Sequence, residues 1–156
     1  MRTCVAINAH LHIIGPITFS IDSKDLVRVG MDYIDNLKLT YYKDYEEFEN
    51  SHKNVDISYI SRYGDNVYSS KDYKDVNKDY YLMFGRESTG IPHDILRNNI
   101  KEVYRIPMVP DARSLNLSNC VALVSYEVLR QQGFYDLATS ECIKGSDFLE
   151  KEKIKK

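Results

Sequence analysis

The first candidate for chemistry is the loop that follows an apolar run at 80–84. Gly85 and Gly90 stand at its two ends, and Glu87 lies between them. Glycines let a backbone approach a flat or bulky ligand closely. A P-loop, however, places Lys and Ser or Thr after its last glycine, and here Ile and Pro follow Gly90. The loop therefore predicts either an ordinary strand-to-helix turn or a ligand site other than that of a nucleoside triphosphatase.

The second candidate is the segment that follows another apolar run, at 103–106. Two prolines stiffen it, and four small polar side chains, Ser114 and Asn116 among them, lie just before or at the start of a helix. One such side chain suffices to cap the free amides of a helix. Because the four alternate with Leu115 and Leu117, we favour a ligand site; capping with turn formation is the alternative.

Other kinds of chemistry find less support. His10 and His12 would share one face of an extended strand, but the sequence places no third ligand near them, so we expect no metal site. No G-x-S-x-G motif is present. The three cysteines have no metal-type spacing, and an odd number does not indicate a disulfide framework.

Length and charge narrow the class of protein. A chain of 156 residues is sufficient for one domain with one core. Lys and Arg number 21 and Asp and Glu 23, so the net charge of −2 excludes nucleic-acid binding by bulk positive charge and leaves a local basic patch. We see no signal peptide and no run of about 18 apolar residues. We therefore expect a cytoplasmic protein that does not span a membrane.

Alternating strands and helices predict an α/β fold with a mostly parallel sheet flanked by helices. Ligands of such folds bind beyond the carboxyl ends of the strands. The charged stretch 61–79 is interpreted as a solvated loop around a short strand at 67–68, and 80–84 as a central strand covered on both faces. The patterns predict strands at 11–14, 37–41, 57–60, 80–84 and 103–106, and helices at 1–6, 22–29, 44–49, 92–98 and 117–132.

Residues 82–92 and 106–119 together resemble the second and third motifs of the SpoU branch of the SPOUT RNA methyltransferases. The resemblance covers nearly the whole chain, because 2–4, 11–14 and 30–33 also fit. It is greatest for the small, single-domain members that methylate the ribose 2′-hydroxyl of the wobble cytidine or uridine of tRNA. It implies a C-terminal trefoil knot, which general topology rules would not predict, and S-adenosylmethionine as the cofactor.

The resemblance also implies roles for particular residues. It implies a homodimer through the helix at 117–132 and the anticodon loop of tRNA as partner. The residues matched to catalysis are Arg2, Glu87, Ser114 and Asn116. The residues matched to cofactor binding are Ile60, Gly85, Ile106, Met108, Ser114 and Leu115.

Members of the family carry a first strand and an Asn-containing loop before the arginine that matches Arg2. We therefore expect that about 15–20 residues are missing at the N-terminus, the length of one strand and one loop. Residues 1–143 would form an incomplete methyltransferase domain, and 144–156 a charged tail. Three alternatives follow: a cofactor- and RNA-binding protein without activity, a related 2′-O-methyltransferase acting on rRNA or another tRNA position, and a dimeric structural protein.

Overall fold

The computed structural model describes residues 1–17 and 34–153, so the helix expected at 22–29 lies outside the described residues. The strands expected at 11–14, 37–41, 57–60, 80–84 and 103–106 are all present, with ends that differ by up to two residues. In chain order, the described helices, 3-10 helices (η) and strands are α1 (Arg2–Ala6), β1 (Leu11–Ile14), η1 (Ile34–Asn36), β2 (Leu39–Tyr42), α3 (Tyr45–Ser51), β3 (Asp56–Ile60), β4 (Asn66–Val67), η2 (Tyr68–Ser70), β5 (Tyr80–Phe84), α4 (His93–Asn98), η3 (Ile100–Glu102), β6 (Val103–Arg105), α5 (Leu117–Gln131) and α6 (Phe148–Lys153).

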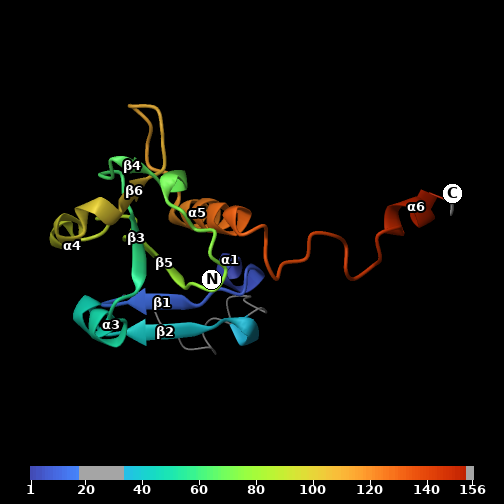
Figure 1. The fold of residues 1–156 in the computed structure, drawn as a ribbon, viewed down its shortest axis with the longest axis horizontal. Helices are drawn as coiled ribbons and strands as arrows, with labels where there is room; N and C mark the ends of the chain where they lie inside the picture. Colours follow the sequence, from blue (N-terminus) through green and yellow to red (C-terminus); the bar gives the residue numbers. More distant parts are fainter. Residues whose placement is uncertain (18–33, 154–156) are drawn as a thin grey trace.

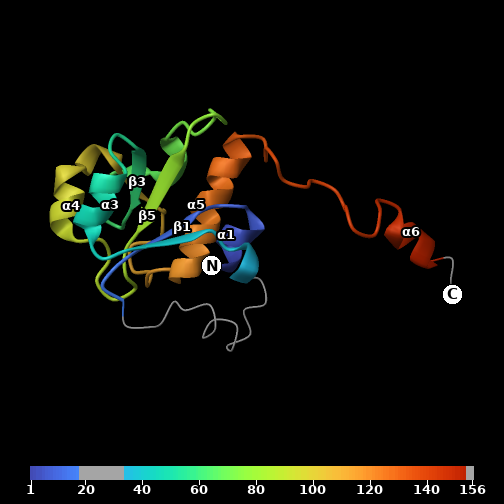
Figure 2. The same cartoon turned by 90° about the horizontal axis from the view of Figure 1, so that it is seen from below.

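All strand pairs are parallel, as expected for an α/β fold. One sheet has the order β1-β2 and the other β4-β6-β3-β5. Ile60 pairs with both Phe84 and Tyr104, so the carboxyl ends of β3, β5 and β6 meet at one edge. Figure 2 shows α3 and α4 on one side of the strands and α1 and α5 on the other. The loops after these three strands therefore converge.

The expectation that β5 is a central, fully covered strand is wrong. Within the described residues β5 is the outer strand of the four-stranded sheet, and all five of its residues are half-buried. Two of the five are tyrosines, whose rings can pack while their hydroxyls stay wet. An apolar run therefore does not separate a central strand from an outer one.

The core of the larger sheet lies between β3 and α4. Tyr59 and Val103 pack against Ile91 and Leu96, all of them buried. Tyr59 points to this side, and Ser58 faces the opposite side of β3 because neighbouring strand residues alternate. The framework that carries the converging loops is thus fixed by packing on the α4 side.

The short strand expected at 67–68 is present as β4, and most of 61–79 is exposed, but the interpretation as a solvated loop is wrong at residues 71–73. Tyr73 is completely buried, and its hydroxyl donates to Ser58 Oγ at 2.9 Å. Gln131, at the end of α5, accepts from the Tyr73 backbone N–H at 2.9 Å and donates to the Lys71 carbonyl at 3.1 Å. Residues 71–73, here called the strap, therefore connect α5 to the sheet. Their contacts with Gln131 join residues at least 58 positions apart in the sequence.

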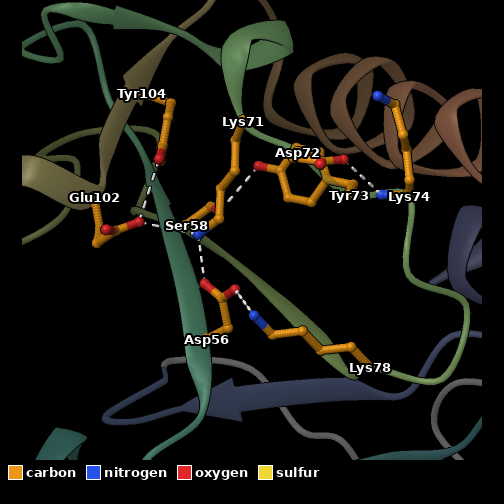
Figure 3. Close-up of polar contacts among 9 residues, drawn as sticks. All are labelled: Asp56, Ser58, Lys71, Asp72, Tyr73, Lys74, Lys78, Glu102 and Tyr104. Carbon is orange, nitrogen blue, oxygen red and sulfur yellow. Dashed lines mark hydrogen bonds and ion pairs between the residues drawn. The ribbon is translucent and has the colours of Figure 1, made fainter.

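An ion cluster anchors the strap, as Figure 3 shows. Lys71 Nζ binds Asp56 on β3 and Glu102, and Lys78 Nζ lies 2.6 Å from Asp56. Tyr104 adds a hydrogen bond to Glu102 at 3.2 Å. Burial lowers the pKa of Lys71, but hydrogen bonds to the two carboxylates outweigh that effect and raise it overall. The cluster keeps Lys71 charged where it is largely removed from water.

The long helix α5 is buried on one side only. Val124 and Val128 face the sheet, whereas Leu123 and Tyr126 on the other side are 37% and 46% exposed.

The chain then runs away from the rest of the molecule to α6 (Figure 1). Ile143 on this stretch is 93% exposed. None of the described helices has the length and apolar character that crossing a membrane requires.

Candidate functional site

A pocket of about 640 Å³ lies where β3, β5 and β6 end. Its volume falls within the range of small-molecule sites. Apolar side chains form much of the lining, and polar groups stand around them. The lining consists of Ile60, Ser61, Arg62, Tyr63, Phe84, Gly85, Arg86, Glu87, Ser88, Thr89, Gly90, Ile91, Ile106, Met108, Ser114, Leu115, Asn116, Leu117 and Cys120.

The loop 85–90 is held by its own backbone. Gly90 N–H donates to the Arg86 carbonyl at 2.8 Å, and Arg86 N–H donates to the Gly90 carbonyl at 3.2 Å. A Cβ at Gly85 would lie 2.0 Å from the Gly90 carbonyl carbon, and Gly90 itself has a φ of +72°. Gly85 is therefore required for the loop to close on itself, which places Glu87 at its tip. The sequence predicts that glycines in this loop let a ligand approach the backbone. At Gly85, the group that lies close is the backbone of the loop itself.

Asn116 joins the two loops and also caps α5. Its Oδ1 accepts from the backbone N–H groups of Ser118 at 2.9 Å and Asn119 at 3.4 Å. Its Nδ2 donates to Glu87 Oε1 at 3.5 Å, a long contact. Capping and ligand binding were treated as alternatives for this segment, yet one side chain caps the helix and lines the pocket.

The structure brings together nearly all the residues singled out from the sequence. Every predicted cofactor-binding residue lines the pocket, and so do the catalytic candidates Glu87, Ser114 and Asn116. Arg2 lies on α1, which packs against α5, and is not among the lining residues. Within the pocket wall, Glu87 contacts Asn116.

Sequence reasoning missed several lining residues. Arg62 and Tyr63 follow β3 directly, so the rule that ligands bind beyond the strand ends could have found them. Cys120 could be found from its position one turn after Asn116 on α5. Burial raises the pKa of its thiol, which keeps the sulfur protonated and makes it a poor nucleophile.

Three histidines lie close together, of which the sequence predicts only His10 and His12 as neighbours. His10 and His12 stack at 4.3 Å between ring centroids, and His52, the residue after α3, lies 5.1 Å from His12. A third histidine is thus present, although His52 Nδ1 is bonded to the Phe48 carbonyl at 3.1 Å. Among residues 1–17 and 34–153, no group of three or more His, Cys, Asp or Glu is arranged to hold a metal ion.

The pocket suits a nucleoside with a charged tail. Ile60, Ile106 and Leu115 offer apolar contacts for a flat base. The Glu87 carboxylate offers a counter-charge for a cation. Apolar faces and an acidic group together match an adenosyl sulfonium such as S-adenosylmethionine.

The fold and the pocket define an α/β protein with a pocket at the ends of its parallel strands. The chain belongs to the SpoU rRNA Methylase family, which residues 1–126 match. It is 48% identical over 133 residues to a Listeria monocytogenes protein provisionally named tRNA (cytidine(34)-2′-O)-methyltransferase, covering 85% of this chain and 79% of that one. The Escherichia coli K12 protein that carries this name without qualification is 39% identical, covering 86% and 84%.

Solved structures agree with this assignment. A provisionally described RNA methyltransferase from Bacillus anthracis superposes with a TM-score of 0.86 at 42% identity, over 90% of this chain and 88% of that one. A structure concerned with methylation of C/U34 on tRNA gives 0.74 at 30% identity, over 85% of each chain. An AdoMet-bound rRNA methyltransferase from Sinorhizobium meliloti gives 0.70 at 26% identity, over 83% of this chain and 49% of that one.

Proposed function

We propose that this protein transfers a methyl group from S-adenosylmethionine to the ribose 2′-hydroxyl of the wobble nucleotide, cytidine or uridine, of tRNA. The observation that carries the proposal is the meeting of the loops after β5 and β6 in one pocket, with Glu87, Ser114 and Asn116 on its wall. Relatives at 39–48% identity carry the name of this activity. The C/U34 structure supports the choice of nucleotide.

When bound, S-adenosylmethionine supplies an electrophilic methyl group. The chain's own contribution is positioning, which can lower a barrier by up to about 7–11 kcal/mol when two reactants are held in line. Ile60, Ile106 and Leu115 would hold the adenosine, with Gly85 and Met108 beside it. The Asn116–Glu87 contact would fix the carboxylate, and Ser114 would orient the ribose or the polar end of the cofactor.

Arg2 is proposed to act on the RNA. A guanidinium does not lose its proton in proteins, so Arg2 is a poor candidate for the base. It would bind a phosphate bidentately and stabilise the developing alkoxide, and the proton would pass to phosphate or water. Because Arg2 is not among the residues that line the pocket, we propose that it reaches the pocket of a second subunit across a dimer formed through α5.

Three finer features belong to the same proposal. The chain after β5 and β6 would be threaded as a trefoil knot around the cofactor, as in SPOUT enzymes. Residues 1–143 would be the methyltransferase unit and 144–156 a charged tail. With tRNA as its substrate, the protein would act in the cytoplasm.

RNA binding must be local because the net charge is −2. Arg86, Arg97 and Arg113 are exposed, and Arg105 is half-buried at the end of β6. Each phosphate that such side chains neutralise steepens the salt dependence of binding. We therefore expect tRNA affinity to fall with salt, with a slope that indicates few phosphate contacts.

Methyl transfer with the purified protein tests the proposal. Tritiated S-adenosylmethionine is incubated with tRNA transcripts that carry cytidine or uridine at position 34, with the same transcripts already 2′-O-methylated there, and with an rRNA fragment. Label should enter only the first set. Incorporation into rRNA or into the blocked tRNA would assign a related activity, and calorimetric binding of the cofactor without incorporation would indicate an inactive binder.

A further inference from the structure

The turn after β3 presents an aromatic side chain that none of the roles above uses. Ser61 N–H donates to the Tyr104 carbonyl at 2.9 Å, and Gly64 N–H donates to the Ser61 carbonyl at 3.2 Å. Tyr63 N–H donates to Ser61 Oγ at 3.3 Å. A Cβ on the buried Gly64 would lie 2.7 Å from the Tyr104 carbonyl carbon, so only glycine allows the turn to pack this closely. The turn therefore holds Tyr63 in a defined place.

The Tyr63 ring stays open to solvent although its backbone is fixed. The side chain is 57% exposed. The Arg62 guanidinium carbon lies 5.9 Å from its ring centroid, and the His93 ring stands at 84° to it with centroids 5.2 Å apart. Both neighbours are exposed as well. Arg62, Tyr63 and His93 thus form an aromatic and cationic surface, here called the tyrosine ledge.

The ledge adjoins the pocket. Arg62 and Tyr63 line it on the β3 side, and Arg86 and Ser88 line it from the loop after β5. A held aromatic face beside the Arg62 guanidinium, on a pocket that Arg86 also lines, matches a ligand with flat bases and phosphates. Unpaired RNA nucleotides offer both, because their bases are free to stack on aromatic side chains. A duplex offers only phosphates, since its bases are already stacked.

We propose that the tyrosine ledge is a base-stacking subsite for an unpaired nucleotide next to the methylated one. Tyr63 stacks on the base, and Arg62 binds the adjoining phosphate. The inference rests on the proposed function, which it deepens by naming the residue that positions the RNA. Tyr63 is a positioning residue here: it presents the 2′-hydroxyl to the pocket and takes no part in the methyl transfer itself.

Binding and kinetics of Tyr63→Ala, Tyr63→Trp and the wild type provide the test. The probe is a fluorescent anticodon stem-loop with cytidine at position 34, measured by anisotropy at one fixed salt concentration. Loss of one stacked base should weaken binding by about tenfold to a hundredfold. The KM for tRNA should rise in Tyr63→Ala, with the Kd for S-adenosylmethionine unchanged. Tyr63→Trp should restore binding, because a larger ring can stack.

Tyr135→Ala is the matched control, since Tyr135 is 60% exposed and is not among the residues that line the pocket. It should bind the stem-loop as the wild type does. Wild-type RNA affinity in Tyr63→Ala would overturn the inference. Weakened cofactor binding without RNA would also overturn it, by making Tyr63 a cover for the cofactor. Failure of the proposed function is distinguishable, because then the wild type itself incorporates no methyl group.

Discussion

At the residue scale, Asn116 serves stability and the pocket through two different atoms. Its Oδ1 caps α5, and its Nδ2 faces Glu87. Asp is as good an N-cap as Asn, but it cannot donate a hydrogen bond to a carboxylate. Substitution at this one position therefore separates the two roles.

We predict that Asn116→Asp retains the stability of the protein within about 0.5 kcal/mol, whereas Asn116→Ala loses about 1 kcal/mol. Methyl transfer should fall by about tenfold to a hundredfold in both, because Glu87 loses the group that positions it. Thermal unfolding and tritium incorporation measure the two effects. Asn77→Asp, at an exposed position that is not among the residues lining the pocket, controls for the added charge. An active Asn116→Asp would remove Asn116 from the site.

His12 makes stability depend on pH. Burial, and then the nearby His10 and His52, lower the pKa of His12 to about 4. The unfolded chain binds that proton near pH 6.5, so the folded state loses stability as the pH falls from about 6.5 to 4 and retains it fully above that range. We predict that the free energy of unfolding falls by about 1–2 kcal/mol more between pH 7 and 5 in the wild type than in His12→Gln. Urea denaturation at pH 7 and at pH 5 measures the free energy of unfolding of both proteins. An equal decrease between the two pH values in the wild type and in His12→Gln would contradict the prediction.

At the element scale, the strap 71–73 couples α5 to the sheet. We predict that Lys71→Met lowers the free energy of unfolding by about 2–4 kcal/mol, because Asp56 and Glu102 would lose the cation between them. Denaturant unfolding measures the change. Lys74→Met is the control, since Lys74 is exposed and adjoins the same strap. Equal stabilities of the two variants would mean that the ion cluster does not hold the strap.

The strap is the part of the fold that the sequence does not predict. Strands, helix α5 and its cap were predictable, because apolar periodicity and capping residues are local signals. The two converging loops were predictable because they follow strands. The burial of Tyr73 was not, since it depends on Gln131 and Ser58, which lie far away in the sequence, and the charges around Tyr73 conceal it. The position of Tyr63 just after β3 was predictable, but the contact with Tyr104 that holds its turn was not.

At the scale of the whole molecule, one surface of α5 and the position of Arg2 indicate the same assembly. Asn119, Leu123, Tyr126 and Arg130 recur every three or four residues, so they form one exposed stripe. A two-fold dimer uses the same patch on both subunits. Because α1 packs on α5, Arg2 would lie close to the interface of the proposed dimer.

We therefore predict that two inactive variants restore activity when they share a dimer. Arg2→Ala and Asn116→Asp are each expected to be nearly inactive alone. Refolded or co-expressed together, half of their dimers are mixed, and each mixed dimer has one site with both side chains intact, so about a quarter of the wild-type activity should return. Leu123→Asp added to both should abolish the recovery and yield monomers in light scattering. Recovery by monomers, or none in proven mixed dimers, would show that Arg2 does not act across the interface.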